Sequence, residues 1–158
     1  MSKNCDVIDS SDVTYIIENP WDVSEYEWNL QDKSDLEGTH LFILNKLKIA
    51  SNGGFSRMWK TSDQKPIAIL GCLKIGDKEF ETFFIASKHM QDHTLKISFE
   101  MRDMLREQSV NFKGYTCYLY SISNHPNQMK WFKFLGFINK PERDTGLNRY
   151  FEYVSPIK

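Results

Sequence analysis

The sequence predicts an α/β domain with a mixed, mostly antiparallel, twisted sheet of about seven strands and four helices on its faces. Three features indicate this class. Residues 55–86 hold three β-prone runs separated by turns of about four residues or fewer, as in an antiparallel meander. A helical stretch then leads into a strong β-prone run at 115–122, which predicts a β-α-β crossover with one parallel strand pair. The hydrophobic fraction of 41% and the charged fraction of 26% are those of an ordinary globular chain.

The expected elements follow in order along the chain. Residues 1–11 are polar and aperiodic, so we expect a loose leader before a single domain over 12–158. The β-branched and aromatic run at 13–17 predicts a first strand. Asn19 and Pro20 have the composition of a helix start. The other expected strands are 55–61, 66–75, 80–86, 115–122, 137–139 and 148–154, and the expected helices are 20–28, 35–50, 92–108 and 124–135.

Some of these elements can be described more closely. The nearly continuous apolar run at 66–75 predicts a strand that is buried on both faces. Gly136 predicts the C-terminus of the last helix. The runs at 137–139 and 148–154 then predict a closing antiparallel hairpin.

Charge and cysteine usage limit the class of protein. The chain has 20 Lys and Arg against 21 Asp and Glu, a net charge of −1, which argues against binding to nucleic acid. No run reaches the roughly 18 apolar residues of a membrane span, and the first eleven residues have no signal-peptide pattern. The three cysteines, Cys5, Cys72 and Cys117, form neither a disulfide framework nor a metal-binding pair, so we expect a cytoplasmic protein without a metal.

The order of elements and the phrase WFKFLGF at 131–137 resemble the GNAT superfamily of N-acetyltransferases. Enzymes of that superfamily often have a tyrosine, three further residues and then Gly-Phe at the end of a short helix. The second half of the chain is similar, more narrowly, to the internal virion protein A family of short-tailed bacteriophages, small GNAT-like proteins without a strong acetyl-CoA signature. The similarity lies in Phe84-Ile85-Ala86-Ser87, Ser123-Asn124-His125 and Phe134-Leu135-Gly136-Phe137.

Two positions depart from the pattern of GNAT enzymes. Those enzymes carry a glycine-rich turn between the fourth strand and its helix, where backbone N–H groups approach the pyrophosphate of coenzyme A. Here the corresponding residues 87–94 read SKHMQDHT, without glycine, and Asp92 would repel a phosphate. The second departure is Phe132, which stands where the tyrosine that protonates the departing thiolate is expected and has no proton to give.

The resemblance implies acetyl-CoA as cofactor, an amine as substrate, and a set of site residues. Glu81 is the expected general base and Tyr120 the substitute general acid. Each has an alternative interpretation, since Glu79 and Glu81 also fit a solvent-facing strand and tyrosines are common in strands. The expected coenzyme-binding residues are Ile85, Ser87, Lys88, His93 and Asn124.

These coenzyme residues also have simpler interpretations. The side chains of Lys88, His89 and His93 would replace the missing glycine turn as a phosphate clamp, or else lie on a solvated loop. Asn124 would hold the pantetheine arm, or else cap the following helix.

Two functions therefore stay open. One is acyl-CoA-dependent transfer of an acetyl group to an amine. The other is a non-catalytic phage protein of the same fold that binds a phage or host protein, in virion assembly or host takeover, in the host cytoplasm. Neither requires a membrane.

Overall fold

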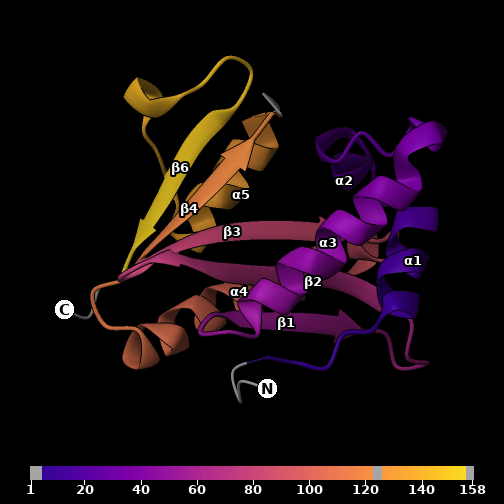
Figure 1. Cartoon of the computed structure of the whole chain (residues 1–158), viewed down its shortest axis with the longest axis horizontal. Coiled ribbons are helices and arrows are strands. Elements are labelled where there is room, and N and C mark those ends of the chain that lie inside the picture. The colour runs from indigo at the N-terminus through magenta and orange to yellow at the C-terminus, as the bar shows by residue number, and fades with distance from the viewer. Residues whose placement is uncertain (1–4, 123–125, 156–158) are drawn as a thin grey trace. The chain divides into compact units, whose positions relative to one another are not determined.

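A computed structural model describes residues 5–122 and 126–155 of the chain (Figure 1). Six strands form one sheet in the hydrogen-bonded order β1-β2-β3-β4-β6-β5. The predicted fold class is confirmed, with six strands in place of about seven. The elements are α1 (Ser10–Glu18), α2 (Asp22–Glu27), η1 (Lys33–Asp35), α3 (Leu36–Ala50), β1 (Phe55–Lys60), β2 (Pro66–Gly76), β3 (Glu79–Ala86), α4 (Met90–Asn111), β4 (Thr116–Ser121), α5 (Pro126–Leu135), β5 (Ile138–Asn139), η2 (Pro141–Arg143) and β6 (Arg149–Val154).

The chain divides into two compact units, which we call the first and the second unit. The first comprises Met1–Lys74 and Phe83–His93, and the second comprises Ile75–Thr82 and Thr94–Lys158. The first unit holds the helices α1 to α3, the strand β1, most of β2 and the second half of β3. The second holds most of α4 and all of the elements from β4 onward.

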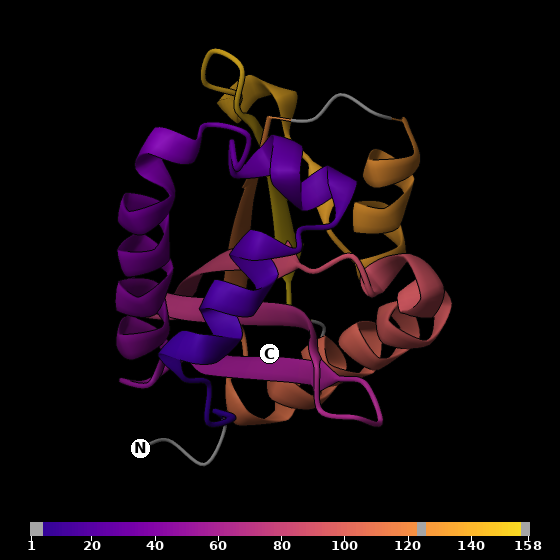
Figure 2. The ribbon, with the colours of Figure 1, turned by 90° about the vertical axis from the view of Figure 1, so that its right-hand side faces the viewer.

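In the first unit, β1 and β2 pair antiparallel, from Phe55 opposite Cys72 to Lys60 opposite Pro66. As predicted, the β2 residues from Pro66 to Leu73 are all buried. The helices α1 and α3 lie side by side (Figure 2). The buried apolar side chains of this unit include Val13, Ile16, Ile17, Leu30, Ile43, Ala50, Ile69, Leu73, Phe83 and Ile85.

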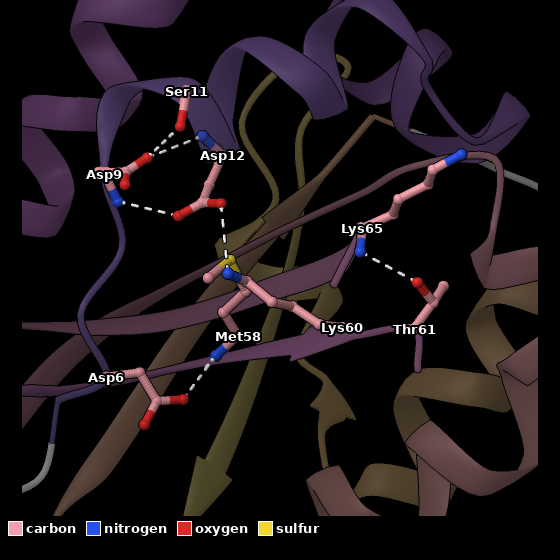
Figure 3. Close-up of polar contacts among 8 residues, drawn as sticks. All are labelled: Asp6, Asp9, Ser11, Asp12, Met58, Lys60, Thr61 and Lys65. Atoms are coloured by element: carbon pink, nitrogen blue, oxygen red, sulfur yellow. Dashed lines mark hydrogen bonds and ion pairs between the residues drawn. The ribbon is translucent and has the colours of Figure 1, made fainter. Parts of the chain in front are cut away.

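The predicted strand at 13–17 is wrong, because these residues belong to the helix α1. The Asp9 carboxylate accepts a hydrogen bond from the Asp12 N–H at 3.1 Å, and the Asp12 carboxylate accepts one from the Asp9 N–H at 3.0 Å (Figure 3). This reciprocal capping box satisfies two backbone donors that a helix start otherwise leaves unpaired. Val13, Ile16 and Ile17 then follow the i, i+3, i+4 spacing of a buried helical stripe.

The predicted helix start at Asn19 and Pro20 is displaced for the same reason. Asn19 is the C-cap of α1, and its N–H donates to the Tyr15 and Ile16 carbonyls. The next helix, α2, begins only after Trp21. A cap-forming residue therefore ended one helix rather than starting the other.

The segment before α1 lies along β1. Cys5 forms an isolated bridge with Ser56, and the Asp6 carboxylate accepts a hydrogen bond from the Met58 N–H at 2.9 Å (Figure 3). In the first turn of α1, the Asp12 carboxylate lies 3.6 Å from the Lys60 ammonium. These contacts connect the N-terminal segment and α1 to one strand of the hairpin.

In the second unit, β3 and β4 pair parallel, from Glu79 opposite Thr116 to Thr82 opposite Leu119, as the crossover predicts. The strands β4 and β6 pair antiparallel, and so do β5 and β6, which confirms the closing hairpin. The helix α5 ends at Leu135, and Gly136 follows it with a left-handed φ of 106°, as predicted.

The helices of the second unit pack on one face of these strands. The Phe132 ring of α5 lies 4.9 Å from the Phe151 ring of β6. The Tyr115 hydroxyl donates to the Leu105 carbonyl of α4 at 3.0 Å. The opposite face of the same strands carries the tyrosines and glutamates of the candidate site.

Candidate functional site

Six aromatic and acidic side chains share one face of β3, β4 and β6. The register places Glu81 opposite Tyr118, Tyr118 opposite Glu152 and Tyr120 opposite Tyr150. Because side chains alternate along a strand, residues two apart lie on the same face as these pairs. We call this surface the tyrosine face; it comprises Glu79, Glu81, Tyr118, Tyr120, Tyr150 and Glu152.

The three rings form a continuous aromatic cluster. The Tyr150 ring centroid lies 5.5 Å from that of Tyr118 and 5.4 Å from that of Tyr120. The Arg143 guanidinium of η2 stands 4.4 Å from the Tyr150 ring centroid and 5.5 Å from that of Tyr118. Its Nη1 also lies 3.9 Å from a Glu152 carboxylate oxygen. One cation therefore lies close to two aromatic rings and one of the three carboxylates.

Two of the three tyrosine hydroxyls already have carboxylate partners. The Tyr118 hydroxyl donates to Glu79 at 2.8 Å, and the Tyr150 hydroxyl donates to Glu152 at 3.0 Å. Burial, and then the hydrogen bond to the carboxylate, raise the pKa of both tyrosines above the ordinary value. These two phenols are held as hydrogen-bond donors and are poor sources of a mobile proton.

Tyr120 is different from the other two tyrosines. Its side chain is 48% exposed, and within the part of the chain that the structure describes its hydroxyl has no hydrogen-bond partner. Glu81 is half-buried on the neighbouring strand, opposite Tyr118 and two residues short of the Tyr120 level. The two predicted catalytic residues therefore lie on the same face of two adjacent parallel strands.

The sequence analysis did not identify three residues on or beside the tyrosine face. Tyr150 and Glu152 alternate on β6, so their shared face follows from strand periodicity once β6 is placed beside β4. Arg143 comes from a short 3₁₀-helix in the hairpin connection, and no periodic pattern marks it. Its position depends on the path of the connection rather than on a motif.

The predicted coenzyme residues of the first unit lie at the end of β3 and the start of α4. Ile85 is fully buried in the core. Ser87 is also buried, and its hydroxyl donates to the Pro66 carbonyl at 2.7 Å. Lys88 is exposed and His93 is half-buried. Asn124, the remaining predicted coenzyme residue, lies outside the described residues.

The backbone of this loop is already engaged. Each of the six N–H groups from Ser87 to Asp92 donates a hydrogen bond within the chain, the longest at 3.4 Å. His89 is engaged as well, because its Nε2 lies 2.5 Å from the Tyr15 hydroxyl and the two rings are stacked. The loop therefore offers a pyrophosphate the side-chain charge of Lys88 and His93, but not the cradle of free N–H groups that a glycine-rich turn provides.

Phe132 packs in the core of the second unit. It is 5% exposed and lies against Phe151 and Trp131. A ring so buried fills the space between α5 and the sheet of the second unit. The position where GNAT enzymes often place a tyrosine is thus part of the core here.

Residues 5–122 and 126–155 show neither a metal site nor a membrane-spanning helix. No three His, Cys, Asp or Glu side chains there gather closely enough to ligate a metal ion. No helix in these ranges combines the length and the apolar composition that a bilayer crossing needs.

Solved structures with the same fold cover almost the whole chain. PH1933 from Pyrococcus horikoshii OT3 has a TM-score of 0.69 at 13% identity, with 98% of each chain covered. The PaiA N-acetyltransferase from Thermoplasma acidophilum, solved in complex with coenzyme A, has a TM-score of 0.61 at 13% identity, covering 93% of this chain and 95% of that one. A GNAT-family acetyltransferase from Staphylococcus aureus Mu50 has a TM-score of 0.61 at 17% identity, with the same coverage.

Sequence comparison adds nothing to this likeness, because no family model and no curated protein matches the chain. At such low identity the structural likeness shows the fold alone. Over nearly its full length, the chain therefore has the fold of the GNAT acetyltransferases.

Proposed function

We propose that this protein is an N-acetyltransferase that uses acetyl-CoA and an amine, with Glu81 as general base and Tyr120 as general acid. The observation that carries the proposal is their shared position on the tyrosine face, with the Tyr120 hydroxyl exposed and without a partner among the described residues. Bound acetyl-CoA would supply the acetyl thioester that the amine attacks. The chain's own residues would supply the proton transfers.

The acidic and aromatic character of the tyrosine face favours a cationic substrate. The tyrosine face has three glutamates and three tyrosines with one arginine beside them, and carboxylates and aromatic faces both attract an ammonium group. An ammonium must lose a proton before its nitrogen can attack, and the Glu81 carboxylate can accept it. The Tyr120 hydroxyl can then give its proton to the leaving sulfur.

The coenzyme would be held by side chains rather than by backbone amides. Lys88 and His93 carry the charge for the pyrophosphate, and Ile85 would offer its backbone at the end of β3. Ser87 holds the loop through its bonds to the β2 backbone, and Asn124 would contact the pantetheine arm. This arrangement predicts weaker coenzyme binding than a glycine-rich loop gives.

The test is acetyl-CoA binding by calorimetry together with thiol release in the presence of a panel of primary amines. Binding should raise the melting temperature, and Lys88→Glu should weaken coenzyme binding more than the matched change Lys48→Glu on the exposed side of α3.

Glu81→Gln should lower kcat/KM by about 10²–10⁴-fold, because it removes the base and leaves the fold intact. Tyr120→Phe should lower kcat with little change in melting temperature.

A second candidate is a non-catalytic protein of the same fold. The engaged N–H groups at Ser87 to Asp92 and the buried Phe132 favour it. With the resemblance to phage internal virion proteins, such a protein would act in virion assembly or on a host protein in the host cytoplasm. If about 1 mM acetyl-CoA gives no heat of binding and no thermal shift, the result favours this candidate over the enzyme.

A further inference from the structure

One face of α4 and α5 in the second unit combines exposed apolar and cationic side chains. On α4 the spacing i, i+4, i+7 and i+11 places Leu95, Phe99, Arg102 and Arg106 along one stripe. On α5 the spacing i, i+4 adds Lys130 and Phe134. We call this surface the α4–α5 face; it comprises Leu95, Phe99, Arg102, Arg106, Lys130 and Phe134.

Contacts between the two helices fix this face. The Trp131 indole N–H donates to the Ser98 hydroxyl at 2.7 Å, and the rings of Phe99 and Phe134 meet edge to face at 5.2 Å. Figure 2 shows the two helices side by side, α5 in orange and α4 in salmon. The surface is therefore formed by two helices held in one arrangement.

Arg102 lies against both phenyl rings. The guanidinium carbon lies 4.9 Å from the Phe99 ring centroid and 4.6 Å from the Phe134 ring centroid. Contacts with two rings restrict the side chain, so less rotamer entropy is lost when it binds a partner. The guanidinium is thereby preorganised.

This guanidinium has unused hydrogen-bonding capacity. Within the described ranges no hydrogen bond or ion pair reaches Arg102, and its Nε is buried without an acceptor. A guanidinium carries five N–H donors in a planar fork that matches a carboxylate. An external carboxylate would meet a donor group that is already oriented.

The side chains around Arg102 indicate which other groups a ligand needs. Leu95 is 72% exposed and Phe99 is 42% exposed, so both offer apolar area to a partner. The six members of the face include three cations and no acid. The acidic residues of α4 in this region, Glu100, Asp103 and Glu107, follow the adjoining helical stripe instead.

We propose that the α4–α5 face binds an acidic, amphipathic segment of a partner protein. A carboxylate of that segment would pair with Arg102, and its apolar side chains would cover Leu95 and Phe99. A nucleic acid fits less well, because a face of each phenyl ring is occupied by Arg102 and the aliphatic Leu95 offers no stacking plane. Arginine and aromatic residues are the types that dominate binding energy at protein interfaces.

This binding surface is independent of acetyl transfer. It uses none of the residues of the tyrosine face and none of the Ser87 to His93 loop. It would serve an acetyltransferase as a docking surface for a protein substrate, and it would serve a non-catalytic protein as its principal interface.

The experiment selects the ligand class without assuming it. A random 16-residue peptide library is selected on the full chain, and enriched peptides are synthesised with a fluorescent label for anisotropy titration. We expect enriched sequences to combine Asp or Glu with Leu, Phe or Trp at helical spacing. Their Kd should rise about tenfold or more in Arg102→Gln and in Phe99→Ser, because each removes a central contact.

Matched variants separate this surface from general charge. Lys113→Gln removes an exposed cation outside the α4–α5 face and should leave Kd within about twofold of the wild type. Arg102→Lys keeps the charge without the planar fork and should give an intermediate Kd. Circular dichroism melting of each variant confirms that the fold is kept.

Several results would overturn the proposal. They are an absence of enriched peptides, enriched peptides that are not acidic, and equal binding to Arg102→Gln and wild type. Tighter binding of a single-stranded oligonucleotide, or of phosphatidylglycerol vesicles, than of the acidic peptides would assign the surface to another class of partner.

Discussion

The Phe132 side chain connects the stability of the second unit with the choice between the two candidate functions. Its ring is buried against Phe151, so truncation to Ala should cost about 3–5 kcal/mol of unfolding free energy. Phe132→Tyr adds a hydroxyl in a packed region and should cost about 1–3 kcal/mol, because that hydroxyl would be left unpaired. Urea unfolding of the two variants measures both values. A Tyr variant as stable as the wild type, with faster thiol release from acetyl-CoA, would place this position at the coenzyme and contradict the packing role.

Tyr150 gives the tyrosine face a dependence on pH. Its pKa is raised in the folded state by burial and by the hydrogen bond to Glu152, whereas in the unfolded chain it is near the usual value of about 10. The folded protein therefore holds this proton more tightly than the unfolded chain does. The resulting stabilisation is complete below about pH 10 and is lost as the pH rises above that value.

Tyr150→Phe tests this dependence. Between about pH 9 and about pH 10.5, the variant should lose less unfolding free energy than the wild type. These limits bracket the pKa of a free tyrosine, which is about 10. The measurement is urea unfolding at matched ionic strength. All other titratable groups, Tyr118 included, are present in both proteins, so the difference between the two curves reports on Tyr150. Parallel curves would show that Tyr150 titrates alike in both states.

Individual residues were predictable where a period or a chemical role was enough. The alternation of side chains along a strand predicts that Glu79 and Glu81 share one face of β3, and the register with β4 agrees. Tertiary contacts decided the rest. Neither the engagement of Ser87 with the β2 backbone nor the position of Arg143 over Tyr150 follows from local sequence.

At the scale of elements, the helix α1 shows how a cap outweighs β propensity. Its run of Val, Thr, Tyr and two Ile has the composition of a strand. The difference in propensity between helix and strand is only on the order of tenths of a kcal/mol per residue. The Asp9–Asp12 capping box and the burial of Ile16 decide for the helix. Both signals stand in the sequence, since Asp9 and Asp12 are three residues apart just before an apolar stripe.

The hairpin β1–β2 and the helix α3 offer a matched pair of glycine substitutions. A Cβ at Gly71 of β2 would overlap the buried Phe83 ring, so Gly71→Ala should destabilise the protein by about 1–3 kcal/mol. A Cβ at Gly38 of α3 would meet the exposed Asp35 carboxylate, which can rotate away. Gly38→Ala should therefore stabilise by about 0.5–1 kcal/mol through helix propensity.

Thermal and urea unfolding of both variants measures this pair. Opposite signs are expected, because the same added methyl group enters a filled core in one case and an exposed helix in the other. A neutral Gly71→Ala would mean that the Phe83 ring has room to move, and would contradict close packing at this point of the first unit.

For the molecule as a whole, the sequence was most informative about the order of elements. Ten of the elements seen in the structure correspond to predicted ones, of which only the boundaries moved, because long periodic runs such as 66–75 and 92–108 define an element from many residues at once. The division into units was not predictable in this way. Its boundaries fall inside β2, β3 and α4, where no linker composition marks them.

These boundaries predict a single cooperative unfolding transition, as expected for one domain over 12–158. Each unit contains a part of β2, β3 and α4, so neither can lose its structure without breaking an element that continues into the other. The tryptophans allow a test, because Trp21, Trp28 and Trp59 belong to the first unit and Trp131 belongs to the second. In Trp131→Phe, tryptophan fluorescence reports on the first unit alone, whereas far-ultraviolet circular dichroism reports on both. The variant loses the hydrogen bond to Ser98 and should melt at a lower temperature, yet its two signals should share one midpoint. Separate midpoints would show that the first unit unfolds by itself, and would divide the chain into two domains despite the elements that they share.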